Sequence, residues 1–474
     1  MSSRRWARFG RPIFMVLAMI TEGLAATGGQ RPTDEPVVRV DYRERLTERQ
    51  TRRLDVDRHA AETRWRTMVD IIDRATVVID DVQRQWLERG RRADLEPREP
   101  LDDGTLVFSR VRDGDHVPPD VAREREAIER VRTAGILEEL RAWARDPIGM
   151  RPIGDRNGPM FRDHPDELGD ARRLTQLRVA SMRLALREGD LGEVADAFTD
   201  VLALARAFSG QTNLLDQLVA GAMFQLATRE LRQELTESRF PEPVARRLLD
   251  ALTAPAWGAS LELAVERERL VFRDLVQRVF SDDGHGDGVF VPGAAARLAG
   301  VSGAEAPPEV IGSRRDHLET HDAQLQPFIA AARRGMEPGW LRLEVASVDD
   351  PALPLVDQMI PAVDTLFQQA VMAAFHLEAT RVMVAIEIYH DRHGTPPLEL
   401  AELTPEILPT LPLDPMNGRP FVYGRRPDGS YALHGCGADG VDHGGAFPER
   451  DPRGLERGND TRVIFGRNRL PTPQ

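Results

Sequence analysis

Apolar residues recur every three or four positions through most of the chain, and this spacing predicts a mainly α-helical protein. In the segment 42–90, for example, Trp65, Met68 and Ile72 would share one face of a helix, with charged residues on the opposite face. We expect a long amphipathic helix there, broken once. The same pattern predicts further helices over 118–145, 170–188, 191–208, 213–235, 241–252, 257–280, 315–334 and 355–391.

The turn between two of these helices, residues 187–198 with the sequence REGDLGEVADAF, resembles a tetratricopeptide-type helical hairpin. Its small residues Ala195 and Ala197 would let the two helices approach closely. No second copy follows at the repeat length of such arrays, about 34 residues, so we expect an irregular helical bundle or short solenoid. Surfaces of this kind usually bind other proteins, and a spacer without a partner groove is the alternative.

Two segments of the helical region are expected to lack regular structure. Residues 281–288, SDDGHGDG, alternate acidic residues with glycine, a composition that can hold calcium on a flexible loop. The EF-hand pattern lacks its closing Glu here, so a plain surface loop is the expectation. Residues 289–313 are rich in Ala, Gly and Pro and are expected to be irregular.

Near the end of the chain the pattern changes from helical spacing to short strands between turns. Asn417-Gly418 and Asp428-Gly429 are strong turn dipeptides, because Gly adopts positive φ readily and Asn or Asp tolerates it. The β-prone runs 421–423 and 431–433 therefore predict a hairpin. We expect it to pack on the preceding helix through Val384, Ile388, Leu403, Phe421, Tyr423, Tyr431 and Leu433.

The order of these features resembles the globular domain of the major pseudopilin of type II secretion systems. They are a long helix followed by HGTPP, LPLDP, NGRPF, DGSYAL and GADG. The likeness covers residues 365–465, about a fifth of the chain. It implies a small α+β domain with a helix ended by a Gly turn, a three-stranded sheet and a calcium-binding loop. It also implies partner proteins, among them components of a secretion apparatus.

The loop 439–445 is the candidate metal site. Asp439 and Asp442 lie three residues apart on a glycine-rich loop, so their carboxylates can converge on one hard cation. By resemblance to the pseudopilin, the calcium ligands would be Asp439, the Cys436 carbonyl and Asp460, with Asp442 as a further candidate. Two departures from the pseudopilin pattern keep a plain Asp439-Gly440 turn as an alternative. The insertion 446–459 is longer than the family's loop, and Gly435-Cys436 replaces the family's usual apolar pair.

The net charge and the absence of several sequence motifs exclude some classes of function. The net charge of −13 argues against a general nucleic-acid binder, because phosphate affinity comes from concentrated positive charge. The single cysteine, Cys436, excludes internal disulfides and Cys-based zinc clusters. The chain has no Walker A loop, no GxSxG motif and no GxGxxG before a helix, because its glycine-rich run 435–445 follows a predicted strand but leads to no helix. We therefore predict a non-catalytic binding or assembly protein. The alternatives are an envelope hydrolase with an unrecognised site in the helical region, and a domain used for its fold alone.

The N-terminus predicts export. Arg4, Arg5, Arg8 and Arg11 precede the apolar run 13–20 and several small residues, the order of a secretory signal peptide. The run is shorter than the about 20 residues of a membrane span, and a frayed helix is the alternative. We expect a periplasmic or envelope protein that reaches the inner membrane only through this segment. The expected divisions are a signal peptide or short anchor over 1–26, a linker over 27–40, a helical domain over 41–350 and a pseudopilin-like domain over 355–474.

Overall fold

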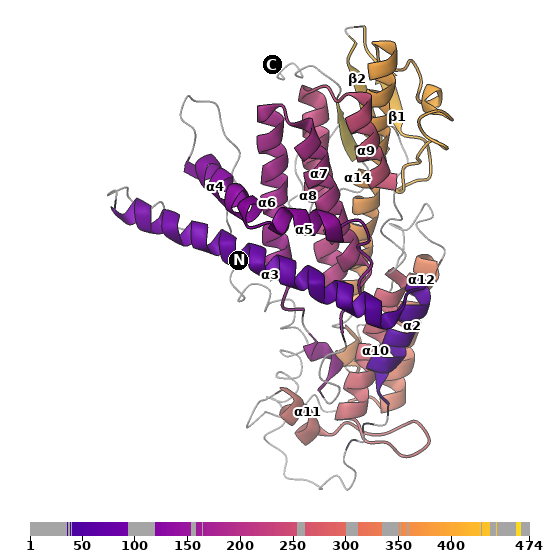
Figure 1. Ribbon diagram of the computed structural model, residues 1–474. Helices are drawn as coiled ribbons and strands as arrows, with labels where there is room; N and C mark the ends of the chain where they lie inside the picture. The colour runs from indigo at the N-terminus through magenta and orange to yellow at the C-terminus, as the bar shows by residue number, and fades with distance from the viewer. Residues whose placement is uncertain are drawn as a thin grey trace.

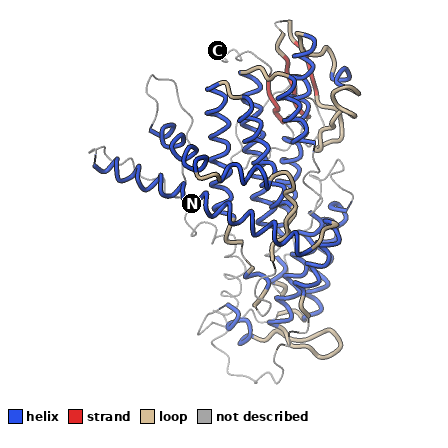
Figure 2. The backbone as a smooth tube through the Cα atoms, in the orientation of Figure 1, coloured by secondary structure: helices blue, strands red, loops and turns tan. Residues whose placement is uncertain are grey.

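The computed structural model of the protein is mainly helical, with a small sheet beside one end of its central helices (Figure 1). Figure 2 shows the same division, with the red strands confined to one corner. The expected fold class, mainly α with a small antiparallel sheet near the C-terminus, is confirmed. The structure describes residues 36, 38, 40–92, 119–152, 158–163, 165–253, 261–299, 311–333, 350, 352–357, 360–427, 429–436, 442 and 461–465.

The helix expected over 42–90 forms with its single break, as α2 (Tyr42–Leu54) and α3 (Arg58–Arg92). Asp41 caps α2 by accepting bonds from two backbone N–H groups, and Asp55 ends it with a left-handed φ of 51°. The helix expected over 118–145 is divided at Gly135, which has a φ of 75°. It forms α4 (Pro119–Thr133) and α5 (Ile136–Trp143).

The predicted helical block after residue 170 forms the centre of the molecule, where neighbouring helices pack side by side (Figure 1). Gly189 ends the first helix in the left-handed conformation, and Asp190 and Asn213 cap the next two with their side chains. Ala195 and Ala197, expected at a close helix approach, are fully buried. The four helices are α6 (Leu168–Glu188), α7 (Leu191–Ser209), α8 (Leu214–Glu237) and α9 (Glu242–Thr253).

A second group of helices lies at the lower end of the view in Figure 1, where α10 (Leu261–Val279) packs on α12 (Arg314–Arg333). The expectation of irregular structure over 289–313 is wrong for α11 (Pro292–Ala299). Its alanines favour a helix, and Pro292 stands at the first helical position, where its missing N–H costs nothing. The short helices η1 (Met160–Arg162) and α13 (Pro354–Asp357) pack against this group.

The predicted hairpin is confirmed as β1 (Val422–Arg425) and β2 (Tyr431–Gly435), which pair antiparallel with Tyr423 opposite Leu433. β3 (Thr461–Phe465) pairs with the other edge of β2, so the sheet order is β1-β2-β3. The long α14 (Ile360–His393) and the short η3 (Leu400–Leu403) precede the sheet. The expected core residues of this unit are buried, apart from Tyr423, which is partly exposed and packs against them.

One hydrophobic core runs from the central helices into the sheet. Residues as distant in sequence as Trp65, Phe208, Phe375 and Leu433 belong to it. α14 packs against α8 and α9 along the bundle and also contacts α12 and η3. Residues on both sides of the division expected near 355 therefore share this core, and the domain boundary there stays a prediction.

None of the described helices combines the length and the hydropathy that a membrane crossing requires. The apolar run 13–20, on which the export prediction depends, lies outside the described residues.

Candidate functional site

Asp414, from the LPLDP segment, organises the turn that leads into the sheet. It is fully buried, and its carboxylate accepts bonds from the Met416 N–H at 2.8 Å and the Asn417 side-chain amide at 3.0 Å. The backbone N–H of Cys436 donates a third bond. Burial raises the pKa of Asp414 to about 6, although these three donors lower it. The turn is thereby joined to the end of β2.

Gly435 allows this join. A Cβ at this position would lie 2.5 Å from Asp414 Oδ2 and 2.5 Å from Phe375 Cε2, closer than real Cβ contacts. Only glycine therefore lets β2 lie against both α14 and the Asp414 turn.

The four predicted metal ligands are only partly described. Asp439 and Asp460 lie outside the described residues. Cys436 is buried just after β2, and Asp442 lies within hydrogen-bonding distance of His434, with 3.0 Å between His434 Nε2 and Asp442 Oδ1. Among the residues whose placement is described, no group of three His, Cys, Asp or Glu side chains could hold a metal. Calcium binding here stays a prediction.

In the acidic loop 281–288 the carboxylates bond to backbone N–H groups of the loop and to residues at the start of α12. Asp283 accepts from the N–H groups of His285 and Asp287, and Asp287 accepts from those of Gly288 and Arg315. These bonds lower the pKa of both Asp283 and Asp287 and close a hairpin-like turn between α10 and α11. The acidic side chains of this loop thus already have partners within the chain, and a plain surface loop stays the expectation here.

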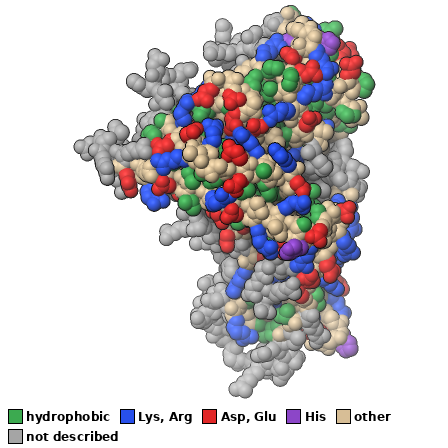
Figure 3. Space-filling view, in the orientation of Figure 1, with side chains coloured by type: hydrophobic (Ala, Val, Ile, Leu, Met, Phe, Trp, Pro, Cys, Tyr) green, Lys and Arg blue, Asp and Glu red, His purple; other side chains and the backbone are tan. Residues whose placement is uncertain are grey.

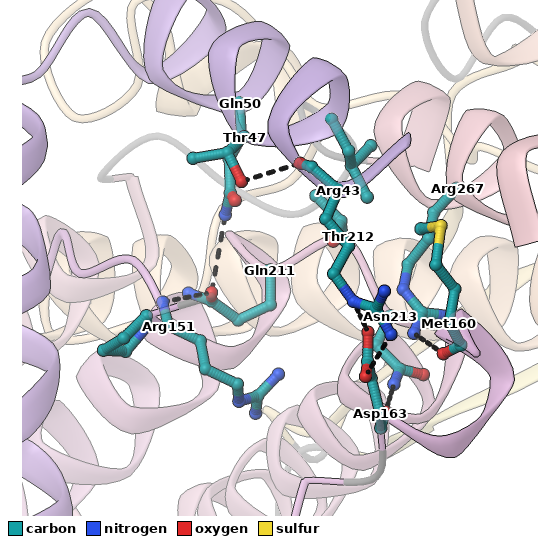
Figure 4. A pocket seen from close by; sticks show the side chains of 12 residues that line it. Arg43, Thr47, Gln50, Arg151, Met160, Asp163, Gln211, Thr212, Asn213 and Arg267 are labelled. Carbon is teal, nitrogen blue, oxygen red and sulfur yellow. Dashed lines mark hydrogen bonds and ion pairs between the residues drawn. The ribbon is translucent and has the colours of Figure 1, made fainter. Parts of the chain in front are cut away.

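The pocket that brings charged groups together lies elsewhere, in the helical region. It has a volume of about 170 Å³ and is bordered by α2, α10, residues 151–152 and 160–163, and the turn from α7 to α8 (Figure 4). Its lining residues are Arg43, Leu46, Thr47, Gln50, Arg151, Pro152, Met160, Asp163, Gln211, Thr212, Asn213 and Arg267.

Two of its arginines are held by carboxylates. Arg43 donates to both oxygens of Asp163, at 2.8 and 2.9 Å. Arg151 donates to both oxygens of the fully buried Asp216, at 2.6 and 2.8 Å, and to Glu167 at 2.8 Å. Burial alone would lower the pKa of each guanidinium, but the neighbouring carboxylates outweigh it and raise the pKa. Both arginines are therefore fixed and charged.

The third arginine is less firmly held. Arg267 is 8 % exposed, and its donors reach Glu268 Oε1 and the Met160 carbonyl only at 3.4 Å each. Arg43 and Arg267 are drawn on one side of the pocket in Figure 4, and Arg151 on the other. Guanidinium groups thus line two sides of the pocket.

The sequence offered no signal for this pocket. Its residues come from four segments between 43 and 267, and none of the four contains a recognisable binding motif. Their meeting depends on how α2 and α10 dock beside the start of α8.

Comparison with known proteins found no match among family models, curated proteins or solved structures. Function is therefore inferred from the residues of this chain and their arrangement.

Proposed function

We propose that the protein is a non-catalytic binding or assembly protein of the bacterial cell envelope, whose helical bundle carries the small C-terminal sheet. The proposal combines the signal-like residues 1–26 with the resemblance of 365–465 to the major pseudopilin of type II secretion. The expected partners are other proteins, including secretion-apparatus components, and membrane contact would be limited to residues 1–26.

The burial of α14 is the observation that best supports a fixed binding module. A helix that assembled with copies of itself would need an apolar face outside its own fold. Phe375, Val382 and Ile386 of α14 are instead fully buried, and α8 and α9 of the same chain pack along the helix. Partners would then meet the sheet and its loops, which the bundle holds in place.

Calcium binding by the C-terminal loop belongs to this proposal. The ligands would be Asp439, Asp442, Asp460 and the Cys436 carbonyl. Because His434 pairs with one oxygen of Asp442, a calcium ion would use the second oxygen or displace the imidazole. Calcium is favoured over magnesium. Calcium accepts six to eight oxygens in irregular geometry, which a glycine-rich loop can supply, whereas magnesium requires a near-ideal octahedron.

A hydrolase site in the helical region is the second candidate, because the pocket collects titratable groups. Its described lining includes one carboxylate, Asp163, and both oxygens of that group accept bonds from Arg43. A general base must accept a proton from its substrate, so this pairing makes Asp163 a poor base. The described lining suits binding better than hydrolysis.

The test has two parts. A phosphatase reporter fused after residue 60 should be active in bacteria if the chain is exported, and an inactive reporter in the cytoplasm would remove the envelope assignment. The full chain should then be cross-linked in cells and its partners identified by mass spectrometry. Envelope proteins should be captured with the native chain and with Gly424→Ala, but poorly with Gly435→Ala, which disturbs the join at the sheet. Equal capture by both variants would contradict a role for the sheet.

A further inference from the structure

We propose that the pocket between α2, α10 and the start of α8 binds a small organic carboxylate. This goes beyond the proposed envelope role and does not depend on it. The inference comes from three guanidinium groups that meet in one pocket, with one carboxylate, Asp163, in the described lining. Guanidinium forks match the planar geometry of a carboxylate, which makes this class of anion the best fit.

The donors are already in place before a ligand enters. Arg43 uses Nε and Nη2 on Asp163, which leaves Nη1 without a partner among the described residues. The hydrogen bonds of Arg267 to described residues are two long contacts at 3.4 Å, so its donors are poorly satisfied for a group that is nine-tenths buried. Fixing these side chains in advance lowers the entropy cost of binding, and an incoming carboxylate would supply the missing acceptors.

The rest of the lining fits an organic anion better than an inorganic one. Leu46, Pro152 and Met160 provide apolar contact, and the Thr212 hydroxyl has no hydrogen-bond partner within the described part of the chain. A volume of about 170 Å³ equals that of about five or six water molecules. Arg151 already donates through Nε, Nη1 and Nη2 to Glu167 and Asp216. One carboxylate of a short dicarboxylate of this size would therefore be bound by Arg43 and Arg267.

Net charge limits the affinity. With Asp163 in the lining and Asp216, Glu167 and Glu268 behind it, four carboxyl groups face the three arginines, so the cluster has no net positive charge. Recognition therefore depends on the direction of N–H groups rather than on the overall field. A dissociation constant of roughly 10 µM to 1 mM is expected for a ligand of this size.

The experiment is isothermal titration calorimetry of the full chain with succinate and glutarate, compared with succinamide and inorganic phosphate. Saturable binding of a dicarboxylate, with succinamide at least roughly tenfold weaker, is the expected result, because each hydrogen bond between charged groups contributes more than a neutral one. The double variant Arg43→Gln, Asp163→Asn removes the pair without changing net charge and should weaken binding roughly tenfold or more. Thr212→Val, a change too small to disturb folding, should also weaken it.

The matched control is the double variant Arg173→Gln, Asp80→Asn, which removes a partly exposed pair between α6 and α3, held at 2.8 Å, outside the pocket lining. It should bind like the native chain. Three results would overturn the proposal: no saturable binding of either dicarboxylate, phosphate binding as tightly as succinate, or equal affinity in the pocket variants and the control. If the double variant does not fold, Thr212→Val and the ligand comparison decide the question.

Discussion

Gly435→Ala is expected to destabilise the whole protein, although it adds a single methyl group. The new Cβ would stand 2.5 Å from both Asp414 Oδ2 and Phe375 Cε2. Neither neighbour can move easily. Phe375 is fully buried, with its ring centre 5.6 Å from that of Phe421, and Asp414 is held by three donors.

The size of the effect follows from what has to move. Forcing an extra methyl into a packed core costs about 1–3 kcal/mol. If Asp414 shifts instead, a hydrogen bond to a buried carboxylate weakens, which costs about 1.5–3 kcal/mol. Because both contacts are too short at once, we expect a loss of about 3–5 kcal/mol in the free energy of unfolding.

Urea denaturation of the full chain, followed by circular dichroism, measures this loss. Gly424→Ala is the matched control, because Gly424 lies in the neighbouring strand and a Cβ there meets nothing within 4 Å. That variant should stay within about 0.5 kcal/mol of the native chain.

A double-mutant cycle identifies the contact responsible. Phe375→Leu shortens the side chain that the new Cβ would meet, so the double variant Gly435→Ala, Phe375→Leu should lose about 1 kcal/mol less than the sum of the single changes. Equal stability of Gly435→Ala and Gly424→Ala, or simple additivity in the cycle, would refute the steric reasoning.

Three further predictions concern pH, modularity and calcium. Burial raises the pKa of Asp414 and of Asp200 to about 6, so each of these two groups adds stability as pH falls from 7 toward 5. Burial lowers the pKa of His321 and His376 to about 3, so each of these two groups removes stability once pH falls below the ordinary histidine pKa of about 6.5. The ionised form of each Asp costs about 3 kcal/mol by this linkage, so in thermal melts Asp414→Asn should lose more stability between pH 7 and pH 5 than the native chain does. A fragment of residues 355–474 should melt without cooperativity, because it exposes the faces of α14 that α8 and α9 cover; a sharp transition would show an independent domain. Calcium should raise the melting temperature of the full chain by an amount equivalent to about 2.7 kcal/mol at a hundredfold excess over the dissociation constant. Asp439→Ala should abolish the rise, and identical melts with calcium and with chelator would reduce the loop to a plain turn.

Much of the secondary structure was predictable from the sequence because it depends on neighbours along the chain. The helical spacing, the Gly189-Asp190 turn and the Asn417-Gly418 and Asp428-Gly429 turns are local signals, and the elements they predict form within a few residues of their expected bounds. The break between α4 and α5 and the helix α11 were missed, since a single Gly or Pro can stand within, before or after a helix.

Contacts between distant segments were decided by the tertiary structure. Arg43 and Asp163 are separated by 120 residues and Arg151 and Asp216 by 65, so no spacing rule could pair them. The sequence likewise marks Gly435 only as one glycine among several, and its role depends on Phe375 and Asp414 reaching the same point in space. The apolar residues of α14 predict a helix, but its burial by the same chain follows from α8 and α9 packing along it. Periodicity determines which face of an element is apolar; docking determines what covers that face.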